Sequence, residues 1–174
     1  MDSRCNCTYI QRAEGGTNMI VLAIDPSTTS TGWCIFNTDM DYYEDYGTIK
    51  PTTKEPIRRI MEIYKQLREL IRVWKPELVV IENLSVTRNA NTTKILAGLQ
   101  VQIEILCVWL NLLYTIVRPS EWRKVVGIKG RTRKEQKANA IQHVTRKYNI
   151  KVNEDEADAI CIGEYAKSIK VEEE

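Results

Sequence analysis

The sequence predicts an α/β fold, with a mixed five-stranded sheet and helices on both of its faces, from three observations. Short apolar runs such as 19–24 and 77–81 have the length and composition of strands buried on both faces. Residues 56–74 carry apolar side chains at helical spacing and end at Lys75-Pro76, which stops a helix. Strands and helices then alternate, which gives the order β-β-β-α-β-α-β-α-α.

The first three strands are expected at 19–24, 33–36 and 46–49. Their connections are short, so they should pair in antiparallel fashion. Residues 39–45 are polar and are interpreted as a hairpin region between the second and third strands.

The second half is expected to contain a helix at 90–110, a strand at 112–117, and helices at 119–122, 132–148 and 153–169. Apolar residues cover nearly the whole circumference of the 90–110 helix, which therefore needs cover on two sides. It is either a central helix of one domain or partly a subunit interface. We favour the interface, and hence a homodimer.

Composition limits the class of protein. The chain has 174 residues, 43% apolar and 28% charged, which fits one globular domain, expected at 19–170 after a flexible leader at 1–18. No apolar run is long enough to span a bilayer, so no membrane association is expected. Three of the five cysteines, Cys34, Cys107 and Cys161, lie in apolar segments, which indicates free thiols and a cytoplasmic location.

The residue types also limit the chemistry. His143 is the only histidine, so mechanisms that need a Ser-His or Cys-His pair are improbable, and His143 itself is interpreted as a surface or packing residue. Residues 118–151 contain eleven Lys and Arg against two acids, whereas the whole chain has a net charge of only +2. Such a segment is a candidate polyanion-binding surface, although charge alone is equally typical of a solvated helix face.

Two acidic residues end predicted strands. Asp25 follows the first strand and Glu82 follows the fourth. Ligands gather at the carboxyl ends of strands in α/β sheets, and two parallel neighbours would bring these carboxylates together. Either residue alone is more typical of a turn.

Two more acids lie in the segment NEDEADAICIGEYA, where Asn153 and Glu156 form a capping box. On a helical wheel Asp155 and Asp158 share the apolar, inward side. The opposite side is expected to carry Glu156, Gly163, Glu164 and Lys167. Two inward carboxylates need a proton or a cation, unless the first turn is frayed and both acids are hydrated.

Four carboxylates without a histidine favour a hard divalent cation such as Mg²⁺. Two such ions can activate water and stabilise the leaving oxygen of a phosphodiester. A cation site beside a basic surface predicts a nuclease.

Four segments, VLAIDPSTTSTGWCIF, LVVIENLSVTRNANTTKILAGLQ, RPSEWRKVVGIKGRTRKEQKANAIQ and NEDEADAICIGEYA, together resemble the RuvC-like Holliday-junction resolvases, over residues 19–166. The resemblance implies a ribonuclease-H-like fold and a homodimer that makes paired symmetric nicks in four-way DNA junctions. It implies two Mg²⁺ or Mn²⁺ ions per active site and 5′-phosphate products. Asp25 should bridge both ions, and Glu82, Asp155 and Asp158 should complete their shells. A phage-encoded member, acting in the host cytoplasm, fits this family.

The resemblance also suggests DNA contacts. The candidates are Arg88, Arg123, Lys124, Arg131, Arg133, Lys134 and Lys137. Ser27 replaces a glycine that is usual in bacterial members, and Ser85 replaces an aromatic residue that helps open base pairs. Trp122 is either a substitute stacking face or, more simply, a buried core residue. We therefore expect weak sequence selectivity.

Other functions remain open at this point. The same acids would serve a general branched-DNA nuclease or an RNA–DNA hybrid nuclease, and an incomplete metal site would leave a non-catalytic nucleic-acid-binding module. The letters D-E-A-D do not indicate a helicase, because the chain has no G-x-x-x-x-G-K-[ST] loop for a nucleotide cofactor.

Overall fold

The computed structural model describes residues 11–12, 19–84 and 89–170. Its centre is a five-stranded sheet with the order β4-β3-β2-β5-β6. The strands are β2 (Ile20–Asp25), β3 (Thr31–Asn37), β4 (Tyr42–Ile49), β5 (Leu78–Glu82) and β6 (Leu113–Val117). β2, β3 and β4 pair in antiparallel fashion, whereas β5 pairs in parallel with both β2 and β6. The predicted mixed sheet is confirmed.

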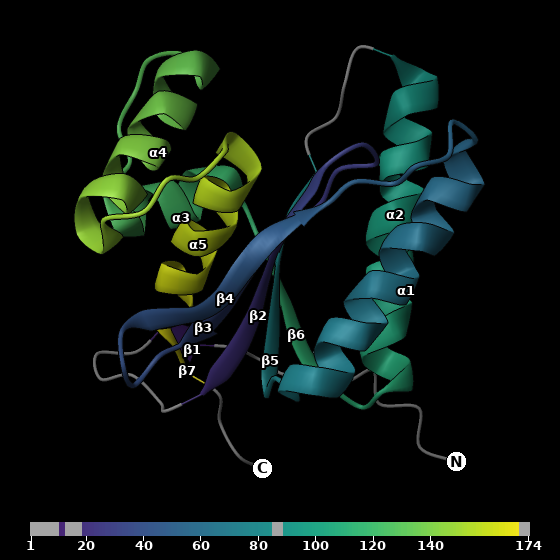
Figure 1. Ribbon diagram of the computed structural model, residues 1–174, viewed down its shortest axis with the longest axis horizontal. Coiled ribbons are helices and arrows are strands. Elements are labelled where there is room, and N and C mark those ends of the chain that lie inside the picture. Colours follow the sequence, from purple (N-terminus) through teal and green to yellow (C-terminus); the bar gives the residue numbers. More distant parts are fainter. Residues whose placement is uncertain (1–10, 13–18, 85–88, 171–174) are drawn as a thin grey trace.

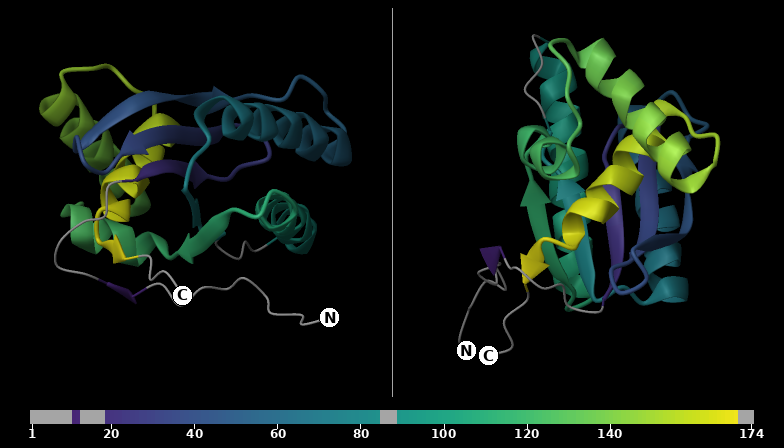
Figure 2. Two further views of the ribbon diagram at one scale, coloured as in Figure 1. Left: turned by 90° about the horizontal axis from the view of Figure 1, so that it is seen from below. Right: turned by 90° about the vertical axis from the view of Figure 1, so that its left-hand side faces the viewer.

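Five helices form layers on the two faces of this sheet (Figure 1). α1 (Pro56–Trp74) and α2 (Ala90–Trp109) cover one face. α3 (Pro119–Val126), α4 (Arg133–Tyr148) and α5 (Glu154–Ala166) lie on the other, where α5 runs directly over the strands (Figure 2). No helix among the described residues is both long and apolar enough to span a bilayer.

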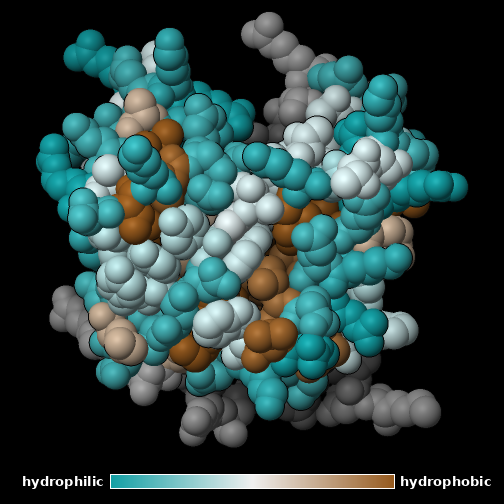
Figure 3. Space-filling view, in the orientation of Figure 1, coloured by the Kyte–Doolittle hydropathy of each residue, from teal (hydrophilic) through white to brown (hydrophobic). Residues whose placement is uncertain are grey.

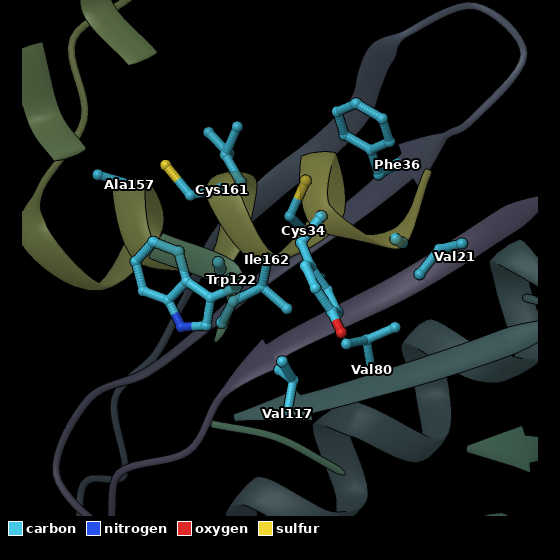
Figure 4. Close-up of a cluster of buried hydrophobic side chains, with 14 of the residues drawn as sticks. Val21, Cys34, Phe36, Val80, Val117, Trp122, Ala157, Cys161 and Ile162 are labelled. Atoms are coloured by element: carbon cyan, nitrogen blue, oxygen red, sulfur yellow. The ribbon is translucent and has the colours of Figure 1, made fainter. Parts of the chain in front are cut away.

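Alternation along the strands divides the core between the two faces. In β2, Val21 and Ala23 belong to the cluster under α5, whereas Leu22 and Ile24 belong to the cluster under α1 and α2. Figure 4 shows the first cluster, in which Trp122 of α3 is fully buried. A strand with both faces covered explains why the run at 19–24 is apolar without interruption.

Several element boundaries differ from the prediction. β4 begins at Tyr42, so part of the predicted hairpin region is strand. Tyr42 stacks on Tyr43 and contacts Tyr148 of α4 edge to face. α3 continues to Val126, and the last helix ends at Ala166 rather than 169. Of the predicted leader, only 11–12 are described; they form β1 and pair with β7 (Ile169–Lys170).

The prediction that Gly163 and Glu164 lie on the outer side of the last helix was wrong. Gly163 is buried against β3, where an added Cβ would come within 2.8 Å of the Phe36 Cβ. The Glu164 side chain is largely covered, with Lys147 at 3.5 Å and His143 at 2.9 Å. α4 lies over this side of α5, which an isolated helical wheel does not reveal.

Candidate active site

Asp25 and Glu82 lie side by side at one edge of the sheet. Ile24 pairs with Ile81 in the parallel register of β2 and β5, so the residues that follow them end their strands together. Glu82 also pairs with Val117 of β6. The predicted meeting of these two carboxylates is confirmed.

The first turn of α5 brings the other two acids to this edge. Asn153 Oδ1 accepts from the Glu156 backbone N–H at 3.0 Å, and Glu156 Oε2 accepts from the Asn153 N–H at 2.9 Å, which is the predicted capping box. Asp155 accepts a hydrogen bond from the Ser30 hydroxyl at 2.6 Å. Asp158 is only 2% exposed. The inward direction of both aspartates is therefore confirmed.

Gly32 allows this approach of helix to strand. It pairs with Asp25 in the β2–β3 ladder, and an added Cβ would overlap the backbone carbonyl of Asp155, with the carbonyl carbon at 2.6 Å. Because Gly32 has no side chain, the first turn of α5 can lie directly against β3 at this point.

The four carboxylates are electrostatically coupled. Burial, followed by the charges of Glu82, Asp158 and Asp155, raises the pKa of Asp25 well above its ordinary value. Burial and the charge of Glu82 raise the pKa of Asp158 to about 7, although Arg123 and Lys137 oppose the shift. In both residues burial is the largest cause of the raised pKa, and the neighbouring carboxylates add to it.

Two residues of α3 hold Glu82. The Trp122 indole N–H donates to Glu82 Oε1 at 2.8 Å. The Arg123 guanidinium lies 3.7 Å from Glu82 Oε1 and 3.9 Å from Asp158 Oδ2, and it stacks over the Trp122 ring at 4.6 Å. A stacking role for Trp122 on DNA is excluded by its burial; it is the core residue of the simpler interpretation, with a polar contact that the sequence did not reveal.

Lys137 of α4 occupies the other side of the cluster. Its Nζ lies 2.9 Å from Glu154 and 3.8 Å from Asp155. Two predicted DNA contacts, Arg123 and Lys137, are therefore also counter-charges of the carboxylates.

The described residues fit a divalent cation in their donor chemistry. Asp158 Oδ1 is buried and has no hydrogen-bond partner, and all four acids offer oxygen ligands. Among the described residues no three acidic, His or Cys side chains already lie in a metal-binding arrangement. Arg123 and Lys137 lie near the carboxylates instead, so bound ions would have to replace these two positive charges.

The remaining basic candidates divide into two groups. Lys124, Arg131, Arg133 and Lys134 are exposed, on α3 and at the start of α4. In Figure 3 the surface around α4 is hydrophilic except for one hydrophobic patch. Arg88 and Ser85 lie outside the described residues. His143 is a packing residue, as expected, and bonds to Glu164.

Comparisons with known proteins find relatives over most of the chain. Residues 21–164 match the family model "Crossover junction endodeoxyribonuclease RuvC". The chain is 32% identical over 147 residues to the RuvC of Rickettsia akari, covering 83% of this chain and 94% of the relative. It is 23% identical over 160 residues to the RuvC of Thermomicrobium roseum, covering 88% and 98%.

Solved structures share the fold. T. thermophilus RuvC in complex with Holliday junction substrate superposes with a TM-score of 0.71 at 16% identity, covering 84% of this chain and 92% of that one. The yeast mitochondrial Holliday junction resolvase superposes with a TM-score of 0.62 at 14% identity, covering 90% and 80%. With a family model that spans most of the chain, the chain belongs to the RuvC family of crossover junction endodeoxyribonucleases.

Proposed function

We propose that this chain is a structure-selective endonuclease that hydrolyses phosphodiesters in four-way DNA junctions at the cluster of Asp25, Glu82, Asp155 and Asp158. One observation carries the proposal. Carboxylates from β2, β5 and α5 converge at one sheet edge, where burial and then the charge of Glu82 raise the pKa of Asp158. Such a cluster is costly to fold and is typical of a functional site.

These four residues would hold two divalent cations, Mg²⁺ or Mn²⁺. When bound, the ions would lower the pKa of the attacking water and stabilise the leaving oxygen, with 5′-phosphate products. Trp122 would fix one Glu82 oxygen through its hydrogen bond, and Ser30 would fix one Asp155 oxygen. Arg123 and Lys137, released from the carboxylates, would be placed to contact the phosphates that flank the scissile bond.

The basic surface next to the cluster supports DNA as the substrate. Lys124 on α3 and Arg131, Arg133 and Lys134 around the start of α4 are exposed and lie on the elements that carry Arg123 and Lys137. Exposed cations of this kind position a nucleic acid through its phosphates and carry no base information. They would suit a substrate recognised by shape, with weak sequence selectivity.

We also propose a homodimer through α2. Val101, Ile105, Val108 and Trp109 form an exposed apolar stripe on this helix, and Trp109 is 82% exposed. Their spacing places them on one side, opposite the side that packs on the sheet. A symmetric pair of subunits would present two clusters to one junction and would make paired nicks.

The buried thiols support a reducing, cytoplasmic location for this enzyme. Cys34, Cys107 and Cys161 are free and buried, and burial raises the pKa of the Cys107 thiol to about 12. The thiols are therefore protected from disulfide exchange.

Cleavage of a mobile and an immobile four-way junction in Mg²⁺, with every strand mapped, tests the proposal. We expect symmetric paired nicks and their loss in Asp25→Asn, with Asp39→Asn, an exposed aspartate outside the cluster, as the control. Cuts confined to flaps and forks would indicate a general branched-DNA nuclease, and cleavage of RNA–DNA hybrid alone would indicate a hybrid nuclease. Junction binding without cleavage would indicate a non-catalytic module.

A further inference from the structure

A cavity of about 620 Å³ adjoins the carboxylate cluster and is not explained by metal binding. It lies between the end of β5, the start of α3 and the start of α4. Arg123 belongs both to this cavity and to the cluster, because its guanidinium lies 3.7 Å from Glu82. A nucleotide whose phosphate lies at the cluster could therefore place its sugar or base in the cavity.

The charge of the lining favours an anion. Arg118, Arg123 and Lys124 line the cavity, and none of the described residues that line it is acidic. A group bound here would carry negative charge, as a nucleotide phosphate does.

The rest of the lining fits a base. Leu84 and Ile128 supply apolar surface, and Asn83 and Gln136 supply carboxamides. The Asn83 backbone N–H donates to the Val117 carbonyl at 2.8 Å, which fixes the residue next to Glu82. Gln136 Nε2 donates to the Gly130 carbonyl at 3.1 Å, which leaves Oε1 available. A carboxamide both donates and accepts, so it can pair with the edge of any base.

We propose that this cavity takes one unstacked nucleotide of the cleaved strand, next to the scissile phosphate. The inference rests on the proposed function. The strand exchange point of a junction is where a nucleotide can leave its stack at least cost. Capture of that nucleotide would direct cleavage to the crossover without an aromatic residue at position 85. Because both carboxamides tolerate every base, selection would follow structure more than sequence.

The first experiment places an abasic site at each of the two nucleotides that flank the scissile phosphate, one at a time. Cleavage of the modified strand is measured relative to the unmodified strand of the same junction, so changes in total activity cancel. For the wild type we expect at least a tenfold loss at one of the two positions. In an Asn83→Ala/Gln136→Ala double variant the abasic site should change the ratio less than about twofold, because the contacts are already gone.

Gln142→Ala is the matched control. Gln142 lies on the same helix as Gln136, is exposed and does not line this cavity. The control should retain the tenfold abasic effect. An abasic effect that is absent in the wild type, or equal in the wild type and the double variant, would overturn the inference.

A second measurement separates the cavity from catalysis. Junctions with 2-aminopurine at the same positions are bound in EDTA, and the fluorescence reports unstacking. We expect an increase of at least threefold with the wild type and with Gln142→Ala, and a smaller one with the double variant. If the wild type binds and unstacks but cleaves no junction, the proposed function fails while the nucleotide site stands. Bound junctions whose 2-aminopurine stays stacked would refute the nucleotide site.

Discussion

Asp158→Asn should stabilise the metal-free protein at alkaline pH, although it removes a residue of the proposed active site. The pKa of Asp158 rises from 3.8 to about 7 on folding, first through burial and then through the charge of Glu82. Between these two values the folded state binds a proton that the unfolded state lacks. Stability therefore falls as pH rises through this window, and the loss is complete above pH 7.

The size of the effect follows from the shift. Each pKa unit corresponds to about 1.4 kcal/mol, so the ionised Asp158 costs about 4 kcal/mol of folding free energy at pH 8. Asparagine carries no charge and avoids this cost. We expect Asp158→Asn to be more stable than the wild type at pH 8 by a few kcal/mol, and the two to converge near pH 4.

Urea denaturation in EDTA at pH 4 to 8 measures this difference, with equal m-values as the condition for comparing free energies. Mg²⁺ should stabilise the wild type at pH 8 but not Asp158→Asn. Asp41→Asn is a control of opposite sign. Hydrogen bonds from Lys167 and Lys147 outweigh burial and lower the pKa of Asp41, so its removal should destabilise the protein at pH 8. An Asp158→Asn protein less stable than the wild type at pH 8 in EDTA would refute the reasoning.

Three further changes test the supports of the site. Trp122→Phe keeps an aromatic ring but removes the donor to Glu82, so half-maximal cleavage should need about tenfold more Mg²⁺. The circular dichroism spectrum should match that of the wild type. An unchanged Mg²⁺ requirement would count against a role of Trp122 in positioning Glu82. Gly32→Ala should lower Tm by several degrees and abolish cleavage, because the new Cβ would overlap the Asp155 carbonyl. Gly98→Ala on α2, where an added Cβ makes only ordinary contacts, should instead raise stability by about 1 kcal/mol. Equal Tm changes in the two variants would contradict the close approach of β3 and α5 at Gly32. Ile105→Glu should give monomers by light scattering and unpaired nicks; a dimer that persists would place the interface elsewhere.

The parts of the site that lie on regular, buried elements could be predicted from the sequence. Asp25 and Glu82 each end an apolar run of strand length, and two parallel strands must bring such ends to one edge. Asp155 and Asp158 follow from a capping box and a helical wheel. These inferences need only the local periodicity of each element and the parallel pairing of two strands, for which an α/β fold offers few alternatives.

Contacts across elements could not be predicted in the same way. Trp122 and Glu82 are forty positions apart. The sequence predicted a buried aromatic ring at Trp122, but it did not predict which residue would accept the hydrogen bond from the indole N–H. Glu164 seemed to face solvent because a wheel describes one helix alone, whereas α4 covers that side of α5 with His143 and Lys147. In both cases tertiary packing decided the environment.

The arrangement of counter-charges explains how the chain can fold around four carboxylates before any ion is bound. Arg123 lies between Glu82 and Asp158 at distances longer than a direct hydrogen bond, and its buried Nε has no partner. Loose pairing of this kind reduces like-charge repulsion without satisfying the carboxylates. Arg123 Nε and Asp158 Oδ1 are both buried without a hydrogen-bond partner, which costs folding free energy in the metal-free state. The binding of ions to the acids and of phosphates to Arg123 would satisfy both groups at once, and would therefore couple substrate binding to metal binding at this edge of the sheet.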